Sequence, residues 1–205
     1  MNILASTYMV NPFDQAISDF FKNILETTGG YFSKRAEMMT NISGLMFIFI
    51  VIGVMLLFKK EYRFIGIVML CSLALNYICN DLFLKKLFQR ERPFIYYGIE
   101  PPGFFVHGYS FPSGHSSFTA AGAWSFFFYW LIVNKRQDKT LLAWSIVLIF
   151  VNFAVMFSRI ALLHHYFTDC LAGLTEGILI ALLVVFIYTI IQKRIESKKQ
   201  LKQNQ

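Results

Sequence analysis

The chain has 205 residues, of which 56% are hydrophobic, 18% aromatic and only 15% charged. Because soluble domains carry roughly 25% charged residues, this composition excludes an ordinary soluble protein. The 19 Lys and Arg against 12 Asp and Glu give a formal net charge of +7, which in so hydrophobic a chain points to membrane topology rather than to nucleic acid. Three cysteines in a chain of this length exclude a disulfide scaffold, and no C-x-x-C pair indicates a zinc or redox site.

Residues 1–40 are predicted to contain one amphipathic helix, with Asn11 as its cap, Pro12 at its first position and Gly29-Gly30 at its end. Apolar residues recur there at spacings of three and four: Phe13, Ile17, Phe20, Phe21, Ile24 and Leu25. Polar residues fall between them: Asp14, Ser18, Lys22 and Glu26. Such a helix either lies in the membrane interface or packs against the rest of the protein, and the sequence leaves both open.

Five apolar stretches are long enough to cross a bilayer as helices, which takes about 17–25 residues each. They cover approximately residues 41–58, 63–84, 114–134, 141–163 and 169–191. We therefore expect an all-α fold, a polytopic membrane helix bundle with about five transmembrane helices over residues 41–192. A basic tail over residues 193–205 would follow it.

Basic residues gather in two short loops and in the tail: Lys59, Lys60, Arg63, Lys135, Arg136, Lys139, Lys193, Arg194, Lys198, Lys199 and Lys202. Because these are 11 of the 19 basic residues, the positive-inside rule predicts that they face the cytoplasm. With five spans in a cell membrane, the N-terminus then lies outside. The other eight fall on the outer side and need a different explanation: Lys22, Lys34, Arg35, Lys85, Lys86, Arg90, Arg92 and Arg159.

Polar residues at the ends of four spans are predicted to meet at this outer face. They are Asp81 and Lys85 after the second span, Ser113-Gly114-His115 at the start of the third, Ser158-Arg159 at the end of the fourth, and His165 and Asp169 at the start of the fifth. All four histidines of the chain lie on the same face: His107, His115, His164 and His165. Because ionisable residues are costly inside a membrane, we interpret the group as a functional site.

This group of residues is suited to phosphoryl transfer. Guanidinium and ammonium groups bind phosphate oxygens, a glycine lets backbone N–H groups approach a ligand, and two separated histidines can act as nucleophile and general acid. The sequence shows neither a cage of several carboxylates nor an H-E-x-x-H motif. We therefore expect phosphoryl transfer with no metal or other cofactor, in which side chains neutralise the phosphoryl charge.

Three blocks of the sequence resemble the signature of a known family. Lys85 to Pro93 matches K-x6-R-P, Pro112 to His115 matches P-S-G-H, and Ser158 to Asp169 matches S-R-x5-H-x3-D. In this order, and each at a predicted helix end, they are similar to the three-part signature of the type 2 phosphatidic acid phosphatase (PAP2) superfamily. That superfamily includes membrane lipid phosphatases, glucose-6-phosphatase and vanadium haloperoxidases. The resemblance covers roughly residues 41–191.

The resemblance implies roles for individual residues. His165 would be the nucleophile that forms a phosphohistidine, Asp169 would hold its imidazole in the productive tautomer, and His115 would protonate the leaving group. The phosphoryl oxygens would be held by Lys85, Arg92, Ser113, Gly114 and Arg159.

Two of these assignments have alternatives. Lys85 stands four residues after Asp81 and could form a structural ion pair with it, alone or together with a role in binding phosphate. His164 adjoins His165, and only the spacing of the motif selects the second histidine.

Three further charged residues near the blocks are open to interpretation. Lys86 and Arg90 would contact lipid headgroups or the substrate, or would simply be solvated charges. Glu176 would either orient a phosphate-binding arginine or form a hydrogen bond between packed helices.

The expected substrate and partner is a phosphorylated membrane lipid, because a site at the membrane boundary favours a phosphate whose lipid tail stays in the bilayer. Candidates are undecaprenyl diphosphate, phosphatidylglycerophosphate, phosphatidic acid and a lipid A phosphate. The aromatic loop over residues 94–111 could cover a headgroup or touch the lipid chains. The alternatives are a non-catalytic membrane transporter or scaffold, and a PAP2-like phosphatase that acts on a soluble phosphate ester.

Overall fold

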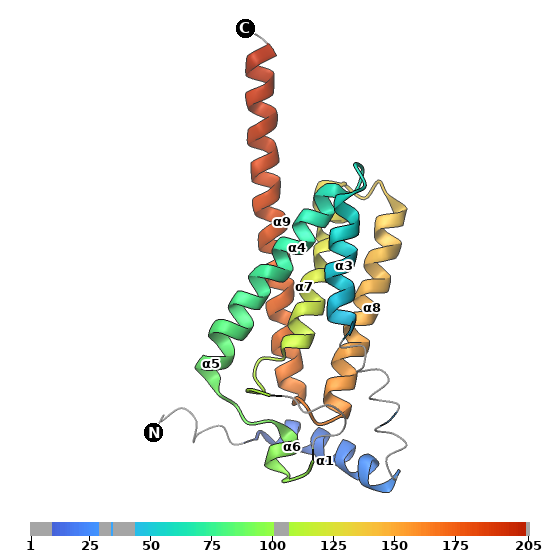
Figure 1. Cartoon of the computed structure of the whole chain (residues 1–205), viewed down its shortest axis with the longest axis vertical. Coiled ribbons are helices and arrows are strands. Elements are labelled where there is room, and N and C mark those ends of the chain that lie inside the picture. The colour runs from blue at the N-terminus through green and yellow to red at the C-terminus, as the bar shows by residue number, and fades with distance from the viewer. Residues whose placement is uncertain (1–9, 29–33, 35–43, 101–106, 204–205) are drawn as a thin grey trace.

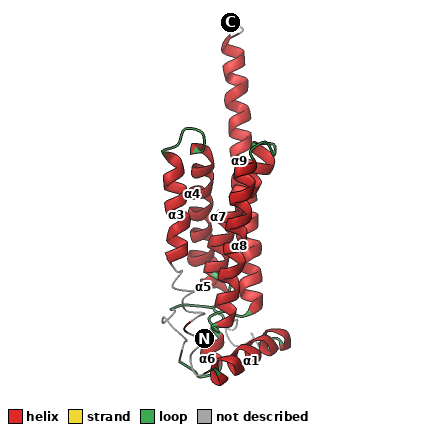
Figure 2. Ribbon diagram, turned by 90° about the vertical axis from the view of Figure 1, so that its right-hand side faces the viewer, coloured by secondary structure: helices red, strands yellow, loops and turns green. Residues whose placement is uncertain are grey.

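A computed structural model describes residues 10–28, 34, 44–100 and 107–203. Within these ranges the protein is all-α and contains no strand. Its long helices run side by side in one bundle, and one helix lies across the end of that bundle (Figures 1 and 2). The predicted helical fold class is therefore confirmed.

In the described ranges, four segments are helical, long and apolar enough to cross a membrane by length and composition. The first contains α4 (Arg63–Tyr77), the π-helix Ile78–Leu84, α5 (Lys85–Phe88) and, after a short break, α6 (Pro93–Tyr96). The others are α7 (Gly114–Phe128) with the π-helix Tyr129–Val133, α8 (Lys139–Ala161) and α9 (Phe167–Gln203). A shorter apolar helix, α3 (Gly44–Leu57), packs beside α4. Residues 41–43 of the predicted first span lie outside the described residues.

α7 lies at the centre of the bundle, where it contacts α3, α4, α8 and α9. Two glycines of α9 allow a close approach to α7: a Cβ atom at Gly173 would lie 2.5 Å from the carbonyl oxygen of Ser113, and one at Gly177 would lie 2.6 Å from Cβ of Ala120. Small residues let helix backbones approach in this way. Because α7 and α9 begin at the same end of the bundle, this contact holds their first turns side by side (Figure 1).

α1 (Pro12–Thr27) lies across that same end of the bundle (Figures 1 and 2). Asn11 caps it as predicted, because its side-chain oxygen accepts a hydrogen bond of 2.8 Å from the N–H of Asp14. Ile17 and Phe21 pack against an apolar cluster contributed by α8 and α9. Of the two positions left open by the sequence, the structure thus places α1 against the bundle.

α1 is amphipathic as predicted, but the side that meets the bundle also carries two polar residues, and part of its apolar face is exposed. Asp14 and Ser18 are buried, whereas Phe13 and Phe20 are 58% and 60% exposed. The reason is that Asp14 binds polar groups of the bundle, and this turns both phenylalanines toward the surface of the protein.

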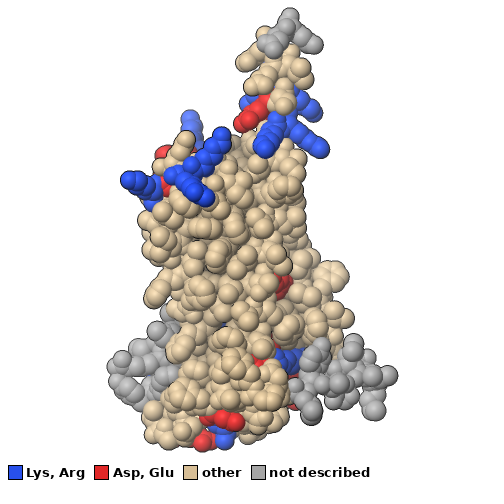
Figure 3. All heavy atoms as spheres, turned by 180° about the vertical axis from the view of Figure 1, so that it is seen from behind, with Lys and Arg blue, Asp and Glu red and all other residues tan. Residues whose placement is uncertain are grey.

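Basic residues gather at the opposite end of the bundle, around the α3–α4 loop, the start of α8 and the last turns of α9 (Figure 3). The described part of the predicted basic tail, from residue 193, is helical, since α9 continues without a break to Gln203 and projects beyond the bundle (Figure 1). Lys, Gln and Glu are good helix formers, which explains why the helix extends into this polar segment.

Candidate active site

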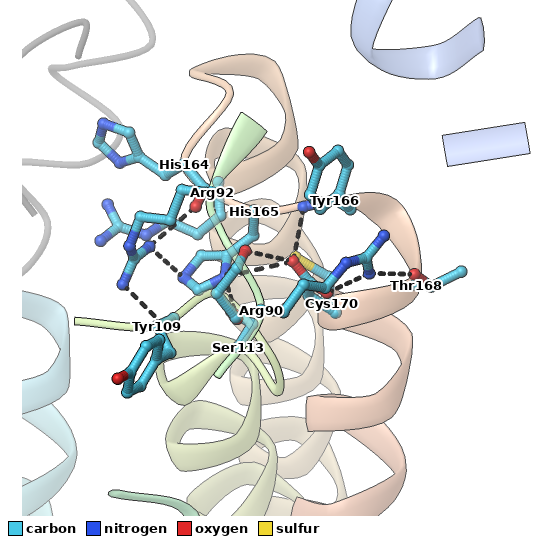
Figure 4. Close-up of polar contacts among 12 residues, drawn as sticks. Arg90, Arg92, Tyr109, Ser113, His164, His165, Tyr166, Thr168 and Cys170 are labelled. Carbon is cyan, nitrogen blue, oxygen red and sulfur yellow. Dashed lines mark hydrogen bonds and ion pairs between the residues drawn. The ribbon is translucent and has the colours of Figure 1, made fainter. Parts of the chain in front are cut away.

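The predicted site residues lie at the end of the bundle where α7 and α9 begin and where α5 and α8 end (Figure 1). Figure 4 labels three of them, Arg92, Ser113 and His165. All eight come from the three sequence blocks: Lys85, Arg92, Ser113, Gly114, His115, Arg159, His165 and Asp169. Each is placed there by a helix terminus or by the loop next to one.

His165 lies in the turn between α8 and α9 and is 2% exposed. Its Nδ1 is 2.7 Å from the carbonyl oxygen of Ser110, and its Nε2 is 3.1 Å from a terminal nitrogen of Arg92 (Figure 4). Because a carbonyl oxygen only accepts and a guanidinium only donates, these partners assign the proton to Nδ1 and leave the lone pair on Nε2. Nε2 is therefore the nitrogen that is available to attack.

The surroundings of His165 disfavour its charged form. Burial, followed by the positive charges of Arg92, Arg159 and Lys85, holds the pKa of His165 well below its ordinary value. The imidazole is therefore neutral at neutral pH, as a nitrogen nucleophile must be.

Asp169 lies in the first turn of α9 and is fully buried. Its Oδ2 is 3.8 Å from Nδ1 of His165, which is too long for a hydrogen bond. That oxygen instead accepts hydrogen bonds from the hydroxyl of Ser110 at 2.5 Å and from the N–H of Tyr166 at 2.9 Å, while Oδ1 is 2.6 Å from Arg90. Asp169 is therefore linked to the imidazole of His165 through Ser110. The hydroxyl of Ser110 donates to Asp169, and its carbonyl oxygen accepts from Nδ1 of His165.

Ser110 and Arg90 are functional-site residues that sequence reasoning missed. The N–H of Ser110 donates to the carbonyl of Arg90 at 2.7 Å, which joins the two loops. The interpretation of Arg90 as a headgroup contact or a solvated charge is wrong. It is only 9% exposed, pairs with two carboxylates, and lies with its guanidinium carbon 4.0 Å from the centre of the Tyr166 ring (Figure 4). Its place two residues before Arg92, inside the first block, is the one sequence signal that could have singled it out.

Arg92 is 2% exposed, and its guanidinium holds the backbone around His165. It donates hydrogen bonds of 2.8–3.3 Å to the carbonyl oxygens of His107, Gly108, Tyr109 and His164. These bonds tie the 107–109 segment to the turn that carries His165, so Arg92 is a structural centre of the site as well as a phosphate-binding candidate.

The ring of His164 points away from that of His165 (Figure 4). It packs edge-to-face against Phe94, with the ring centres 6.2 Å apart. The geometry thus agrees with the motif spacing in selecting His165.

Arg159 and His115 form the other half of the site. Arg159, at the end of α8, is 3% exposed, and one of its terminal nitrogens lies 3.1 Å from each ring nitrogen of His115 in the first turn of α7. Among the described residues, its Nε is a buried nitrogen without a hydrogen-bond partner. A guanidinium with donor capacity left over is suited to a phosphate oxygen.

Lys85 faces the N-terminus of α7. Its Nζ forms the ion pair with Asp81 that the sequence suggested, at 2.5 Å, and also lies 2.8 Å from the position of a Cβ atom at Gly114. A side chain at residue 114 would displace the ammonium group, so the glycine is required for this approach.

Ser113 caps α7. Its hydroxyl oxygen accepts hydrogen bonds from the hydroxyl and the N–H of Ser116, and its own N–H donates to the carbonyl of Asp169 at 3.0 Å. The first N–H groups of a helix have no intrahelical acceptor, and the helix dipole makes this end an anion-binding site. Ser113 therefore caps the helix that carries His115 and joins it to the first turn of α9.

Glu176 forms a hydrogen bond between helices, the second of its two interpretations, because it accepts from the amide of Asn80 at 2.6 Å. In the described part of the chain, no group of three His, Cys, Asp or Glu side chains is arranged to hold a metal ion.

Comparison with known proteins agrees with this geometry. The family profile described as the PAP2 superfamily matches residues 65–195, a range that contains all three sequence blocks. The fold is similar to the crystal structure of "the first transmembrane PAP2 type phosphatidylglycerolphosphate phosphatase from Bacillus subtilis", with a TM-score of 0.60, 24% sequence identity, and coverage of 87% of this chain and 97% of that one. No curated protein sequence matches the chain significantly. Since the profile covers more than half of its length, the chain belongs to the PAP2 superfamily, as a multi-pass membrane protein.

Proposed function

We propose that this protein is a metal-independent membrane lipid phosphatase that forms a phosphohistidine at Nε2 of His165. The observation that carries this proposal is the buried, neutral imidazole of His165, whose Nδ1–H is bound by Ser110 and whose Nε2 faces Arg92. Both the membrane-spanning character of the chain and its superfamily support the reading.

In the first step, Nε2 of His165 attacks the phosphorus atom of the substrate, and the bond between phosphorus and the leaving oxygen breaks. His115 donates a proton to that oxygen, so the lipid leaves as an alcohol, or as a monophosphate if the substrate is a diphosphate. The Nδ1–H bond to Ser110 stabilises the positive charge that develops on the imidazole, and Asp169 holds Ser110 in place.

In the second step, water attacks the phosphohistidine. His115, now deprotonated, accepts a proton from that water, the P–N bond breaks, and inorganic phosphate leaves with His165 returned to its neutral form. Both steps use the same two histidines in opposite directions, as microscopic reversibility requires.

The charge of the transferring phosphoryl group is neutralised by side chains in this proposal. Arg159 contacts His115, Lys85 lies beside Gly114 at the N-terminus of α7, and Arg92 faces Nε2 of His165. Such preorganised donors stabilise phosphoryl transfer without a metal ion. We therefore expect phosphate release to persist in excess EDTA; a strict requirement for a divalent cation would contradict this part of the proposal.

We further propose that the substrate is a phosphorylated lipid and that the site faces the outer side of the membrane. The site lies at one end of the bundle and the basic residues at the other (Figures 1 and 3), which by the positive-inside rule puts the basic end in the cytoplasm. A phosphate at the membrane boundary then reaches His165 while its lipid tail remains in the bilayer. The Bacillus subtilis protein of similar fold is named for phosphatidylglycerolphosphate, so this lipid is the first to test.

The test is a panel of lipid phosphates assayed side by side for phosphate release by the purified protein in detergent. The panel holds phosphatidylglycerophosphate, phosphatidic acid, undecaprenyl diphosphate and a lipid A phosphate, with glycerol phosphate as the soluble control. We expect turnover of at least one lipid, little turnover of the soluble ester, and none by His165→Ala. Turnover by His165→Ala would overturn the nucleophile assignment, and a preference for the soluble ester would overturn the lipid assignment.

A further inference from the structure

The N-terminal helix α1 carries a buried carboxylate, Asp14, that lies outside the range of the family profile, which begins at residue 65. Asp14 is 0% exposed although it belongs to a short helix at the end of the bundle. One of its oxygens accepts a hydrogen bond of 3.0 Å from the N–H of Thr168, and the other accepts from the Thr168 hydroxyl at 2.5 Å and from Arg90 at 2.8 Å.

These contacts give Asp14 two physical roles. Its bond to the N–H of Thr168 satisfies a donor in the first turn of α9, so a residue from another helix caps α9 next to Asp169. Its negative charge neutralises one side of Arg90, whose other side pairs with Asp169 at 2.6 Å. A carboxylate at the start of a helix is also favoured by the helix dipole.

A continuous series of contacts leads from Asp14 to the nucleophile. Arg90 uses one terminal nitrogen for Asp14 and the other for Asp169. Asp169 accepts from the hydroxyl of Ser110, and the carbonyl of Ser110 accepts from Nδ1 of His165. Every residue in the series is buried, so none of these charges is screened by bulk water.

We propose that Asp14 is a positioning residue for the phosphoryl-transfer reaction: through Arg90 and Thr168, the N-terminal helix fixes Asp169 and hence the orientation of the His165 ring. This inference rests on the proposed function, in which His165 is the nucleophile. It assigns to α1 a part in the reaction that neither the three sequence blocks nor the matched family range contains.

The two terminal nitrogens of the Arg90 guanidinium allow it to bind Asp14 and Asp169 at the same time. A guanidinium can bind two carboxylates with two separate nitrogens, whereas an ammonium is a single point charge. Arg90→Lys is therefore expected to retain one partner at most and to loosen Asp169 in the same way as a change at Asp14.

The test compares Asp14→Asn with wild type and with a matched control, Glu26→Gln. Both substitutions remove one carboxylate charge from α1, but Glu26 is exposed and pairs with Lys22 on its own helix. Asp14→Asn is expected to lower kcat by about 10- to 100-fold and to change KM by less than about threefold. A loss of kcat of this size is what a small misplacement of a reacting group causes. Glu26→Gln is expected to keep wild-type kcat. Equal kcat in Asp14→Asn and wild type would overturn the inference.

A conservative variant separates positioning from general destabilisation. Asp14→Glu retains the charge opposite Arg90 and is expected to keep more of kcat than Asp14→Asn; a loss of kcat in Asp14→Glu as large as that in Asp14→Asn would contradict the role of the charge. Because Asp14→Glu keeps the carboxylate that pairs with Arg90, it still tests the inference if Asp14→Asn does not fold.

A second readout needs no substrate. Diethyl pyrocarbonate modifies neutral imidazoles, and the fraction of modified His165 can be read by peptide mass spectrometry. The buried ring should react slowly in wild type and in Glu26→Gln, and several-fold faster in folded Asp14→Asn and Arg90→Lys. If His165 is modified at the same rate in Asp14→Asn as in wild type, the inference is overturned, whatever the substrate of the protein is. If modification is faster in Asp14→Asn but the wild-type protein hydrolyses no lipid phosphate, only the proposed function is rejected.

Discussion

Gly177→Ala should reduce activity although Gly177 is two turns along α9 from Asp169 and touches no catalytic candidate. A Cβ atom at residue 177 would lie 2.6 Å from Cβ of Ala120 and 2.8 Å from the backbone N of Ala121. Ordinary van der Waals contact begins at 3.4 Å, so the helices must separate by about 1 Å, because the opposing atoms belong to the backbone or to a methyl group with no freedom to move.

Separating the two helices should lower both the free energy of unfolding and the catalytic rate, by amounts that can be estimated. Overpacking of this kind costs about 1–3 kcal/mol. A movement of about 1 Å between α7 and α9 would also separate His115 from His165, since His115 lies in the first turn of α7 and His165 lies in the turn that leads directly into α9. A misplacement of about 1 Å costs on the order of 100-fold in rate. We therefore expect kcat for lipid phosphate hydrolysis to fall about 10- to 100-fold, with a lower midpoint of thermal unfolding in detergent.

Gly53→Ala is the matched control for this experiment. The three atoms nearest to its Cβ atom would all belong to the Leu70 side chain, at 2.8–3.7 Å, and this side chain can change its rotamer. The substitution adds the same methyl group to a helix of the same bundle without touching the α7–α9 contact. Wild-type kcat and thermal stability in Gly177→Ala would refute the reasoning, and an equal loss in Gly53→Ala would show that the effect is not specific to α7 and α9.

Two further predictions concern the chemistry. Vanadate, which adopts the trigonal-bipyramidal geometry of the transferring phosphoryl group, should inhibit competitively against lipid phosphate, and an absence of inhibition at millimolar concentration would argue against the phosphohistidine. Because burial and neighbouring cations hold the pKa of His165 below its ordinary value of about 6.5, the neutral nucleophile should persist as the pH falls through that value. Histidine-labelled protein followed by NMR, with His165→Asn to assign the signal, should show its midpoint well below about 6.5; a midpoint at or above that value would contradict the burial argument.

The bundle and the position of its site were predictable because both depend on local patterns. Apolar runs of sufficient length define membrane helices wherever they occur, and the three blocks fall at the ends of those runs. Once the helices alternate in direction, the residues at their ends must meet on one face. The pairing of Lys85 with Asp81 was accessible for the same reason, since residues four apart share a helix face.

The network behind the nucleophile was not predictable, because its contacts join residues that are distant in the chain. Asp14 and Thr168 are 154 positions apart, and Arg90 and Asp169 are 79 apart. A spacing rule carries no information about such pairs. The one local hint was the position of Asp14 on the same helical stripe as Ile17 and Phe21, both of which pack against the bundle, so that the carboxylate enters the protein with them.

The basic residues at the site end of the bundle differ in how many hydrogen-bond donors their protein contacts leave for a ligand. Arg90 is satisfied by two carboxylates, and Arg92 is largely satisfied by backbone carbonyls, so both act mainly as a frame for the histidines. Arg159 lies against His115 with its Nε unpartnered among the described residues, and Lys85 balances only Asp81 beside the N-terminus of α7. The phosphoryl group should therefore be bound chiefly from the side of His115, with Arg92 as its single contact on the side of the nucleophile. Such an uneven distribution of cations suits an in-line transfer. Arg159 and Lys85 then stand beside the leaving oxygen, and Arg92 is the cation beside the attacking Nε2 of His165.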